Sequence, residues 1–193
     1  MNNKLNICLI KASLPSYFPD KYDVWGKSLS ELTKICKGLN VNLKIIDEIP
    51  MNANDAKNAL AECDEVKADF VLILHGGFTM GDVALTFAAS KFKLGFWSVP
   101  EPIRTGDIQL NNFVSLNMSM SIAKKVRNTQ KYPIRWFHGN ADSPEFIKKL
   151  TMTLKALNAL KTLSNTRIGL IGGLAMTFYL SLIHISEPTR HDQ

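Results

Sequence analysis

The chain has 193 residues, of which 46% are hydrophobic and 21% are charged, the ordinary balance of a folded globular protein. Its formal net charge of +6 raises the question of nucleic-acid binding, but the lysines and arginines are scattered and accompany no nucleic-acid-binding motif. We therefore expect neither a disordered protein nor a nucleic-acid binder.

Three cysteines, Cys8, Cys36 and Cys63, fall at expected strand and helix positions, and no pair of them has metal-ligand or redox spacing. This pattern predicts free, buried thiols in a reducing compartment. The N-terminus has too short an apolar run for a signal peptide and no small-residue cleavage site. Together these features predict a cytoplasmic protein.

The first half of the chain alternates short apolar runs with amphipathic segments, which indicates strands joined by crossover helices. Residues 5–11 form the first expected strand, and the helix after it is expected to end at Gly38 in the left-handed conformation. Residues 41–46 form the second strand, before a helix that begins near Asn54 or Asp55. The core-facing positions expected in these helices are Trp25, Leu29, Leu32 and Cys36, then Ala59, Leu60, Cys63 and Val66.

The middle of the chain contains its most continuous apolar run. Residues 69–74 are apolar after the first aspartate, which predicts a central strand buried on both faces. A glycine-containing turn and a short helix follow, then a strand at 94–97, an irregular loop and a helix over about 110–126. The core-facing positions expected in the two helices are Val83, Phe87 and Ala88, then Leu110, Phe113, Val114, Met118 and Ile122.

The last expected unit is a strand at 132–137 and a helix whose start carries clear capping signals. Asp142 or Ser143 is placed to cap it, and Pro144 occupies its first turn. Its expected inward residues are Phe146, Ile147, Leu150, Leu154, Leu157 and Leu160. Five such units predict an α/β fold with a doubly wound parallel sheet, Rossmann- or flavodoxin-like, over residues 1–164.

The C-terminal region differs from the rest. Residues 163–166 predict a hinge, after which an apolar run with paired glycines, about 166–172, predicts the first strand of a second α/β domain at 165–179. An added strand of the first sheet is the alternative. Residues 168–185 lack charges and are long enough for a membrane helix. We expect a strand there instead, and no membrane anchor.

The tail, residues 180–193, contains LSLIHISEPTR, which resembles the translated read-through of a sequencing-library transposon adapter. We therefore expect the native sequence to end near Tyr179 and exclude the tail from the fold prediction.

Ligands of open parallel sheets gather at the carboxyl ends of the strands. The residues expected in the loops there are Lys11, Ser13, His75, Gly76, Gly77, Thr79, Trp97, Glu101, Arg104, Asn111, Asn112, His138 and Asn140.

Each of the main candidates in these loops has two interpretations. The glycine turn at 76–77 suits either a phosphate or a tight turn out of a buried strand. His75 and His138 suit either a metal or a polar pocket wall, and without nearby carboxylates at ligand spacing the wall is favoured. Glu101 is a general base or loop surface, and Trp97 is a sugar platform or core. No nucleophile–base set is evident, so the residues alone predict a pocket-bearing domain.

The stretch LGFWSVPEPIRTGDIQLNNFVSLNMSMSIAKK, residues 94–125, resembles the N-terminal region of the L-fucose/L-arabinose isomerase-like family. The resemblance covers about residues 4–178 and includes the glycine turn and the order of the later elements. The matching residues are Pro100, Glu101, Gly106, Leu110, Asn111 and Asn112, together with Gly76, Gly77 and Thr79.

This resemblance implies that the parent protein is an aldose–ketose isomerase of carbohydrate metabolism that uses Mn²⁺. In the family the metal ligands come from later domains, so no catalytic or metal-binding residue is expected in this chain, which would be an inactive fragment. The domain is expected to contribute to a homo-oligomer and to the wall over a sugar site, with Trp97, Glu101 and Asn112 as wall candidates. Asn112 and Phe113 depart from the family's usual helix start, which leaves the sugar open.

Two other functions remain open at this point. One is a sugar-binding or regulatory domain without catalysis, because no catalytic set is evident in the chain. The other is a flavodoxin-like binder of a nucleotide or flavin.

Overall fold

A computed structural model describes residues 4–103, 105–127 and 133–167 of the chain. Its centre is a five-stranded sheet in which every neighbouring pair of strands is parallel. The strands are β1 (Asn6–Ala12), β2 (Asn42–Ile46), β3 (Phe70–His75), β4 (Leu94–Ser98) and β5 (Ile134–His138), in the order β2-β1-β3-β4-β5. This is a flavodoxin-like order, and the predicted doubly wound α/β fold is confirmed.

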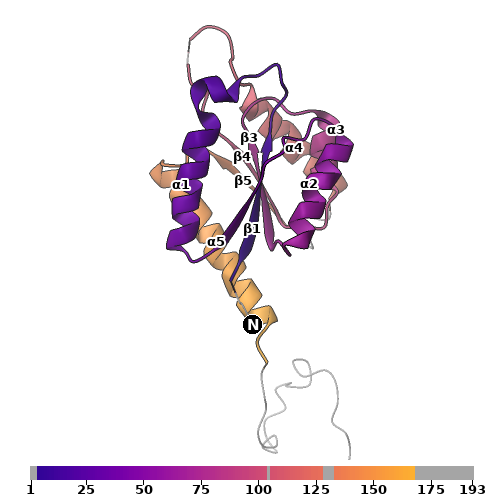
Figure 1. Cartoon of the computed structure of the whole chain (residues 1–193), viewed down its shortest axis with the longest axis vertical. Coiled ribbons are helices and arrows are strands. Elements are labelled where there is room, and N and C mark those ends of the chain that lie inside the picture. The colour runs from indigo at the N-terminus through magenta and orange to yellow at the C-terminus, as the bar shows by residue number, and fades with distance from the viewer. Residues whose placement is uncertain (1–3, 104, 128–132, 168–193) are drawn as a thin grey trace, which may run out of the picture.

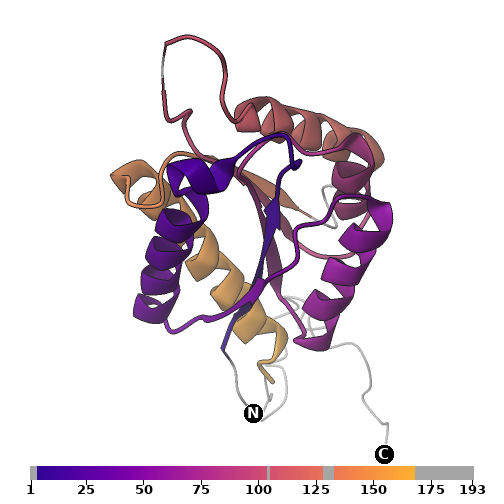
Figure 2. The same ribbon diagram turned by 45° about the horizontal axis from the view of Figure 1, so that its top comes forward.

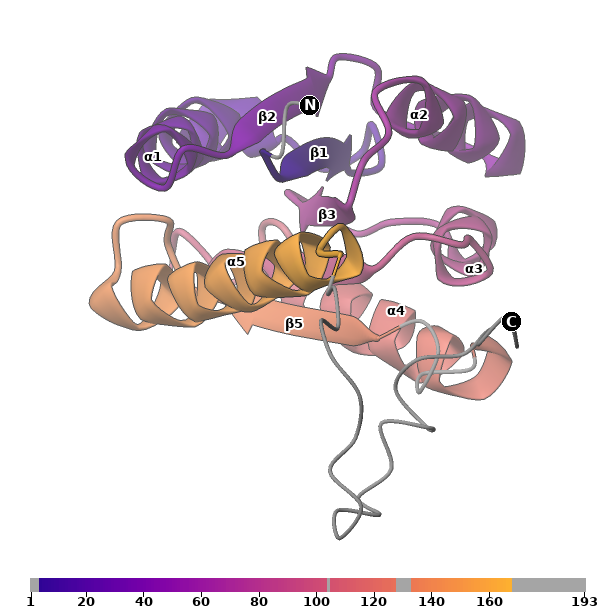
Figure 3. The same cartoon turned by 90° about the horizontal axis from the view of Figure 1, so that it is seen from below.

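Helices cover both faces of the sheet (Figures 1 and 3). They are α1 (Val24–Gly38), α2 (Ala53–Glu65), α3 (Gly81–Ala88), α4 (Asn112–Val126) and α5 (Pro144–Ser164), with a short 3₁₀ turn η1 (Pro19–Tyr22) before α1. One apolar cluster joins α1 and α5 to one face of the strands, and a second joins α2, α3 and α4 to the other. Side chains alternate between these clusters along each strand, as the period of two requires.

The central position of β3 is confirmed, since all six of its residues are buried between β1 and β4. The three cysteines are free and buried, also as predicted. Burial raises the pKa of the Cys36 thiol to about 11, so this thiol is protonated at neutral pH.

Two helix caps account for where α2 and α5 begin. The Asn52 side chain accepts hydrogen bonds from the N–H groups of Asn54 and Asp55, so α2 starts slightly earlier than predicted. Ser143 caps α5 by accepting from the Phe146 N–H, and Pro144 occupies the first helical position. The sequence signals at α5 therefore act as expected.

The expected left-handed end of α1 at Gly38 is wrong. Gly38 is the last residue of α1, and the left-handed residue is Asn40, with φ 54°. Asparagine tolerates this conformation because its short polar side chain bonds locally.

The predicted inward face of the helix over 110–126 is correct for Leu110, which is buried, and for Ile122, which packs against the core, but wrong for Phe113 and Val114. Phe113 and Val114 are 45% and 49% exposed, whereas Asn112, Ser115 and Ser119 are buried. Serines take the inward positions because His75, at the end of β3, faces α4. The hydroxyl groups of Ser115 and Ser119 form hydrogen bonds with its ring nitrogens. Smaller departures are Val66, Ile147 and Leu160, which are exposed at the edges of their helices.

The expected strand at 166–172, the second domain at 165–179 and the tail at 180–193 lie almost entirely outside the described residues. α5 ends at Ser164. Among the helices of the described part, none combines the length and the apolar character that crossing a membrane requires.

Candidate functional site

The carboxyl ends of the strands form one edge of the sheet, where the loops that follow β1, β3, β4 and β5 meet (Figures 1 and 2). The loop after β3 contains Gly76 and Gly77. A Cβ atom at Gly76 would overlap the indole of Trp25, and one at Gly77 would overlap the Ser13 hydroxyl and the Tyr17 side chain. The glycines therefore allow the loop after β1 and the start of α1 to pack closely on β3.

His75 lies at the end of β3 and is completely buried, with 0% of its surface exposed. Its Nδ1 atom lies 3.0 Å from Thr79 Oγ1 and 3.1 Å from Ser115 Oγ, and its Nε2 atom lies 3.2 Å from Ser119 Oγ. Its ring stacks on Phe96 at 5.9 Å. We call His75, Thr79, Ser115 and Ser119 the His75 network.

The His75 network is closed, because both ring nitrogens have hydroxyl partners from the protein. Ser115 Oγ also accepts a hydrogen bond from the Thr79 N–H, at 3.1 Å, which fixes the loop after β3 to α4. Burial lowers the pKa of His75 to about 3, so the ring is neutral at physiological pH. Its position and bonding suit a structural hub.

His138, at the end of β5, is separated from His75 by β4. Its Nδ1 atom lies 2.9 Å from Ser98 Oγ, and Phe113 packs edge-on against its ring at 4.8 Å. Partial burial lowers the pKa of His138, and a hydrogen bond with the Ser98 backbone opposes this shift. The two histidines thus have separate sets of partners.

The described residues do not form a binding site for a metal such as Mn²⁺. Across the described ranges, no three His, Cys, Asp or Glu side chains come together as a group able to hold a metal ion. We therefore derive no chemical step through a metal on this chain.

Of the three wall candidates, Trp97 and Asn112 are fully buried. Trp97 Nε1 donates to the Gly139 carbonyl at 2.9 Å, and its ring packs on Phe146 with centroids 4.5 Å apart. The side-chain nitrogen and oxygen of Asn112 have no hydrogen-bond partner among the described residues. Both side chains lie beneath the surface.

Glu101, the third candidate, reaches back across its own loop. Its carboxylate accepts hydrogen bonds from the N–H groups of Leu110, at 2.9 Å, and Asn111, at 2.7 Å. Asn111 has φ 55° and immediately precedes α4, so the carboxylate lies at the positive end of the helix dipole. Glu101 thereby closes the loop between β4 and α4.

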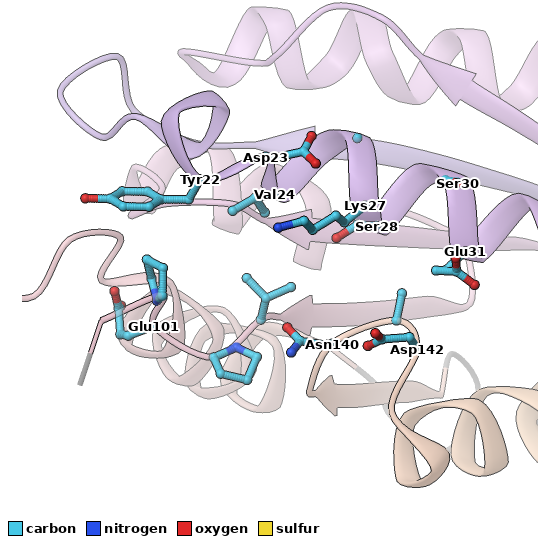
Figure 4. Close-up of a pocket in the computed structure, with 15 residues that line it drawn as sticks. Tyr22, Asp23, Val24, Lys27, Ser28, Ser30, Glu31, Glu101, Asn140 and Asp142 are labelled. Atoms are coloured by element: carbon cyan, nitrogen blue, oxygen red, sulfur yellow. The ribbon is translucent and has the colours of Figure 1, made fainter.

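A cavity of about 860 Å³ lies beside Glu101, between α1 and the loops that follow β4 and β5. We call it the α1 cleft. Residues 22–24, 26–28 and 30–31 line one side, and residues 99–102 and 140–142 line the other. Figure 4 shows Lys27 and Ser28 extending from α1 toward the side on which Asn140 and Asp142 lie.

The charged groups that line the α1 cleft are mostly acidic. The lining contains the carboxylates of Asp23, Glu31, Glu101 and Asp142, and one ammonium group, that of Lys27. Sequence analysis identified Glu101 and Asn140 in this region but missed the α1 residues. These residues could have been suspected because Lys27 and Ser28 lie next to the apolar stripe of α1, near the N-terminal end of the helix that follows β1.

A second cavity, of about 350 Å³, lies between the loops after β1 and β2. Its lining is more apolar and includes Leu14, Phe18, Trp25, Ile49 and Met51. His75, Gly76, Gly77, Thr79 and His138 line neither cavity.

Comparison with known proteins points to sugar chemistry. No protein-family model matches the chain. The chain is 29% identical over 91 residues to the sulfoquinovose isomerases of Priestia aryabhattai and Priestia megaterium. The match covers 47% of this chain and 20% of each relative, so it spans about a fifth of the relatives' length. At this coarse level the chain is distantly similar to part of a sugar isomerase.

Proposed function

We propose that the chain is the N-terminal α/β part of a longer isomerase that interconverts an aldose and a ketose in carbohydrate metabolism. The similarity to two sulfoquinovose isomerases carries the proposal. A cleft with several polar side chains at the carboxyl edge of a parallel sheet supports it, since this is where such folds bind small molecules. The resemblance to the L-fucose isomerase-like family points the same way.

In this proposal the chain shapes a sugar site and does not supply the reacting groups. Glu101 is the wall candidate that lines a cleft, and its two backbone bonds hold that wall in place. Trp97 and Asn112 support the wall from beneath it. The ligands for Mn²⁺, which would stabilise charge on the reacting sugar oxygens, belong to sequence outside this chain. We further propose a cytoplasmic homo-oligomer.

The test uses a longer protein that contains this sequence and the region after it. We expect it to interconvert at least one aldose with its ketose, with L-fucose, L-arabinose and sulfoquinovose as the first substrates. Chelation by EDTA should abolish turnover, and added Mn²⁺ should restore it. A folded longer protein that isomerises none of these sugars with Mn²⁺ present would contradict the proposal. The 193-residue chain alone should be inactive.

A second candidate is a sugar-binding domain without chemistry of its own. The observation that favours it is the α1 cleft, which is lined by residues of this chain and has no metal-binding cluster beside it in the described residues. Saturable sugar binding by a longer protein that shows no turnover would favour this function over the isomerase.

A further inference from the structure

The floor of the α1 cleft contains an unpartnered hydroxyl group. Ser28 is only 3% exposed and lines the cleft, and no hydrogen bond joins its hydroxyl to any described residue. Its Oγ is not among the fully enclosed polar atoms that lack a partner, so this hydroxyl keeps some access to the cleft. Ser28 therefore has one donor and one acceptor available to a molecule in the cleft.

The opposite side of the cleft has complementary groups. Asn140 provides an amide that donates and accepts, and Asp142 a carboxylate that accepts. Lys27, on the same side as Ser28, adds an ammonium group that donates. Val24 and Val99 add apolar surface between these groups. A ligand with several hydroxyl groups on a carbon frame matches this mixture, because each hydroxyl both donates and accepts.

The charge of the lining selects among such ligands. Four carboxylates and one ammonium group belong to the lining. Glu31 is paired with Lys34, and Glu101 accepts two backbone hydrogen bonds, but negative charge is still in excess, so an anionic group entering the cleft meets net repulsion. Sulfoquinovose carries a sulfonate, and sugar phosphates are anionic as well. The lining therefore favours uncharged ligands over these.

We infer that the α1 cleft, with Ser28 at its floor, binds an uncharged sugar and disfavours sulfonated and phosphorylated sugars. The choice of a sugar rests on the proposed function, which this inference deepens by naming the substrate class. The inferred ligand differs from the substrate in the names of the two relatives, since sulfoquinovose is a sulfonated sugar.

The first experiment titrates the complete 193-residue chain with L-arabinose, L-fucose and sulfoquinovose and follows backbone amide signals by NMR. We expect saturable binding of an uncharged sugar, at least about tenfold tighter than that of sulfoquinovose at low salt. The shifts should centre on Ser28 and Asn140, and added salt should narrow the difference. Three results would overturn the inference: no saturable binding, sulfoquinovose binding as tightly, or shifts centred on the second cavity.

Two substitutions test the roles assigned to the lining. Ser28→Ala should weaken binding of the uncharged sugar about fivefold to tenfold, the effect of one hydrogen bond to a buried group. Asp142→Lys should bring the affinity for sulfoquinovose up to or above that for the uncharged sugar. Ser121→Ala, at an exposed position of α4 across the sheet, is the matched control and should bind as the unmodified chain does.

The unfolding midpoint of each variant shows that a loss of binding is not a loss of folding. If Ser28→Ala is folded and binds the sugar normally, the role of the cleft floor is wrong. Turnover by the longer protein without binding by this chain would overturn the inference and leave the proposed function standing. Binding by this chain without turnover by the longer protein would do the reverse.

Discussion

The His75 network and the α1 cleft lie at the same edge of the sheet, on opposite faces, and they treat buried hydroxyl groups differently. In the network, the hydroxyls of Ser115 and Ser119 bond to His75, and no polar group of the ring is left over. In the cleft, the Ser28 hydroxyl has no hydrogen-bond partner among the described residues and keeps some access to the cavity. Polar residues at this edge of the sheet are therefore of two kinds, those that stabilise the fold and those with bonding capacity left for a ligand.

The largest difference between the two regions should appear on removal of the histidine. His75→Ala leaves three buried hydroxyl groups without their partner and opens a cavity, so we expect a loss of roughly 3 kcal/mol or more in the free energy of unfolding. His138→Ala removes an exposed ring with one hydroxyl partner and should cost less than about 1 kcal/mol. Urea unfolding of both variants measures the difference, and equal losses would show that the network is not a structural hub.

The next effect is a dependence of stability on pH. The folded protein keeps His75 neutral down to a pKa of about 3, whereas the same ring in the unfolded chain takes up a proton near pH 6.5. The unfolded state therefore binds more protons between these values, and the stability present above pH 6.5 is lost as the pH falls. We expect a loss of about 2 kcal/mol between pH 7 and pH 5 from this group.

Urea unfolding at several pH values measures this loss, and His75→Gln is the reference, since it lacks the titrating ring. The difference in stability between the two proteins should change with pH at about 1.4 kcal/mol per unit below pH 6. A constant difference would mean that the ring takes up its proton at the same pH in the folded and unfolded states, and would contradict a lowered pKa.

A pair of serine variants sharpens the comparison directly. Ser115→Ala removes a hydroxyl that bonds both His75 and the Thr79 N–H, so it should cost about 1–2 kcal/mol. Ser28→Ala removes a hydroxyl without a protein partner and should change the stability by less than about 0.5 kcal/mol. Thermal or urea unfolding separates the two. A larger loss of stability in Ser28→Ala would mean that the Ser28 hydroxyl forms a structural hydrogen bond, contrary to the inference.

The smallest expected effect concerns the loop that forms one wall of the cleft. Glu101→Gln keeps one acceptor but brings an amide nitrogen against a backbone N–H, so we expect a loss of about 1 kcal/mol. Glu145→Gln, in the exposed first turn of α5, controls for the loss of a charge near a helix start and should cost less than about 0.5 kcal/mol. If the two losses are equal, Glu101 does not hold the loop.

Local patterns in the sequence were sufficient for most of the fold. The unbroken apolar run of β3 required a strand buried on both faces, and the Ser143–Pro144 pair marked the start of α5. The repeated strand–helix order then predicted a parallel sheet with right-handed crossovers. These features depend on neighbours along the chain, which is why the sequence alone identified them.

The candidate site was less accessible to this reasoning. Glu101 and Asn140 were placed at the correct edge of the sheet, but Lys27 and Ser28 were missed, because the cleft joins α1 to loops more than 65 residues further along the chain. The inward face of α4 was misjudged for the same reason: nothing within α4 shows that a histidine of β3 requires its serines. The sequence by itself determined which segments are strands and helices and that polar residues follow the strands. Only the tertiary structure decided which of those residues bond to each other and which face open space, since that depends on which distant segments meet.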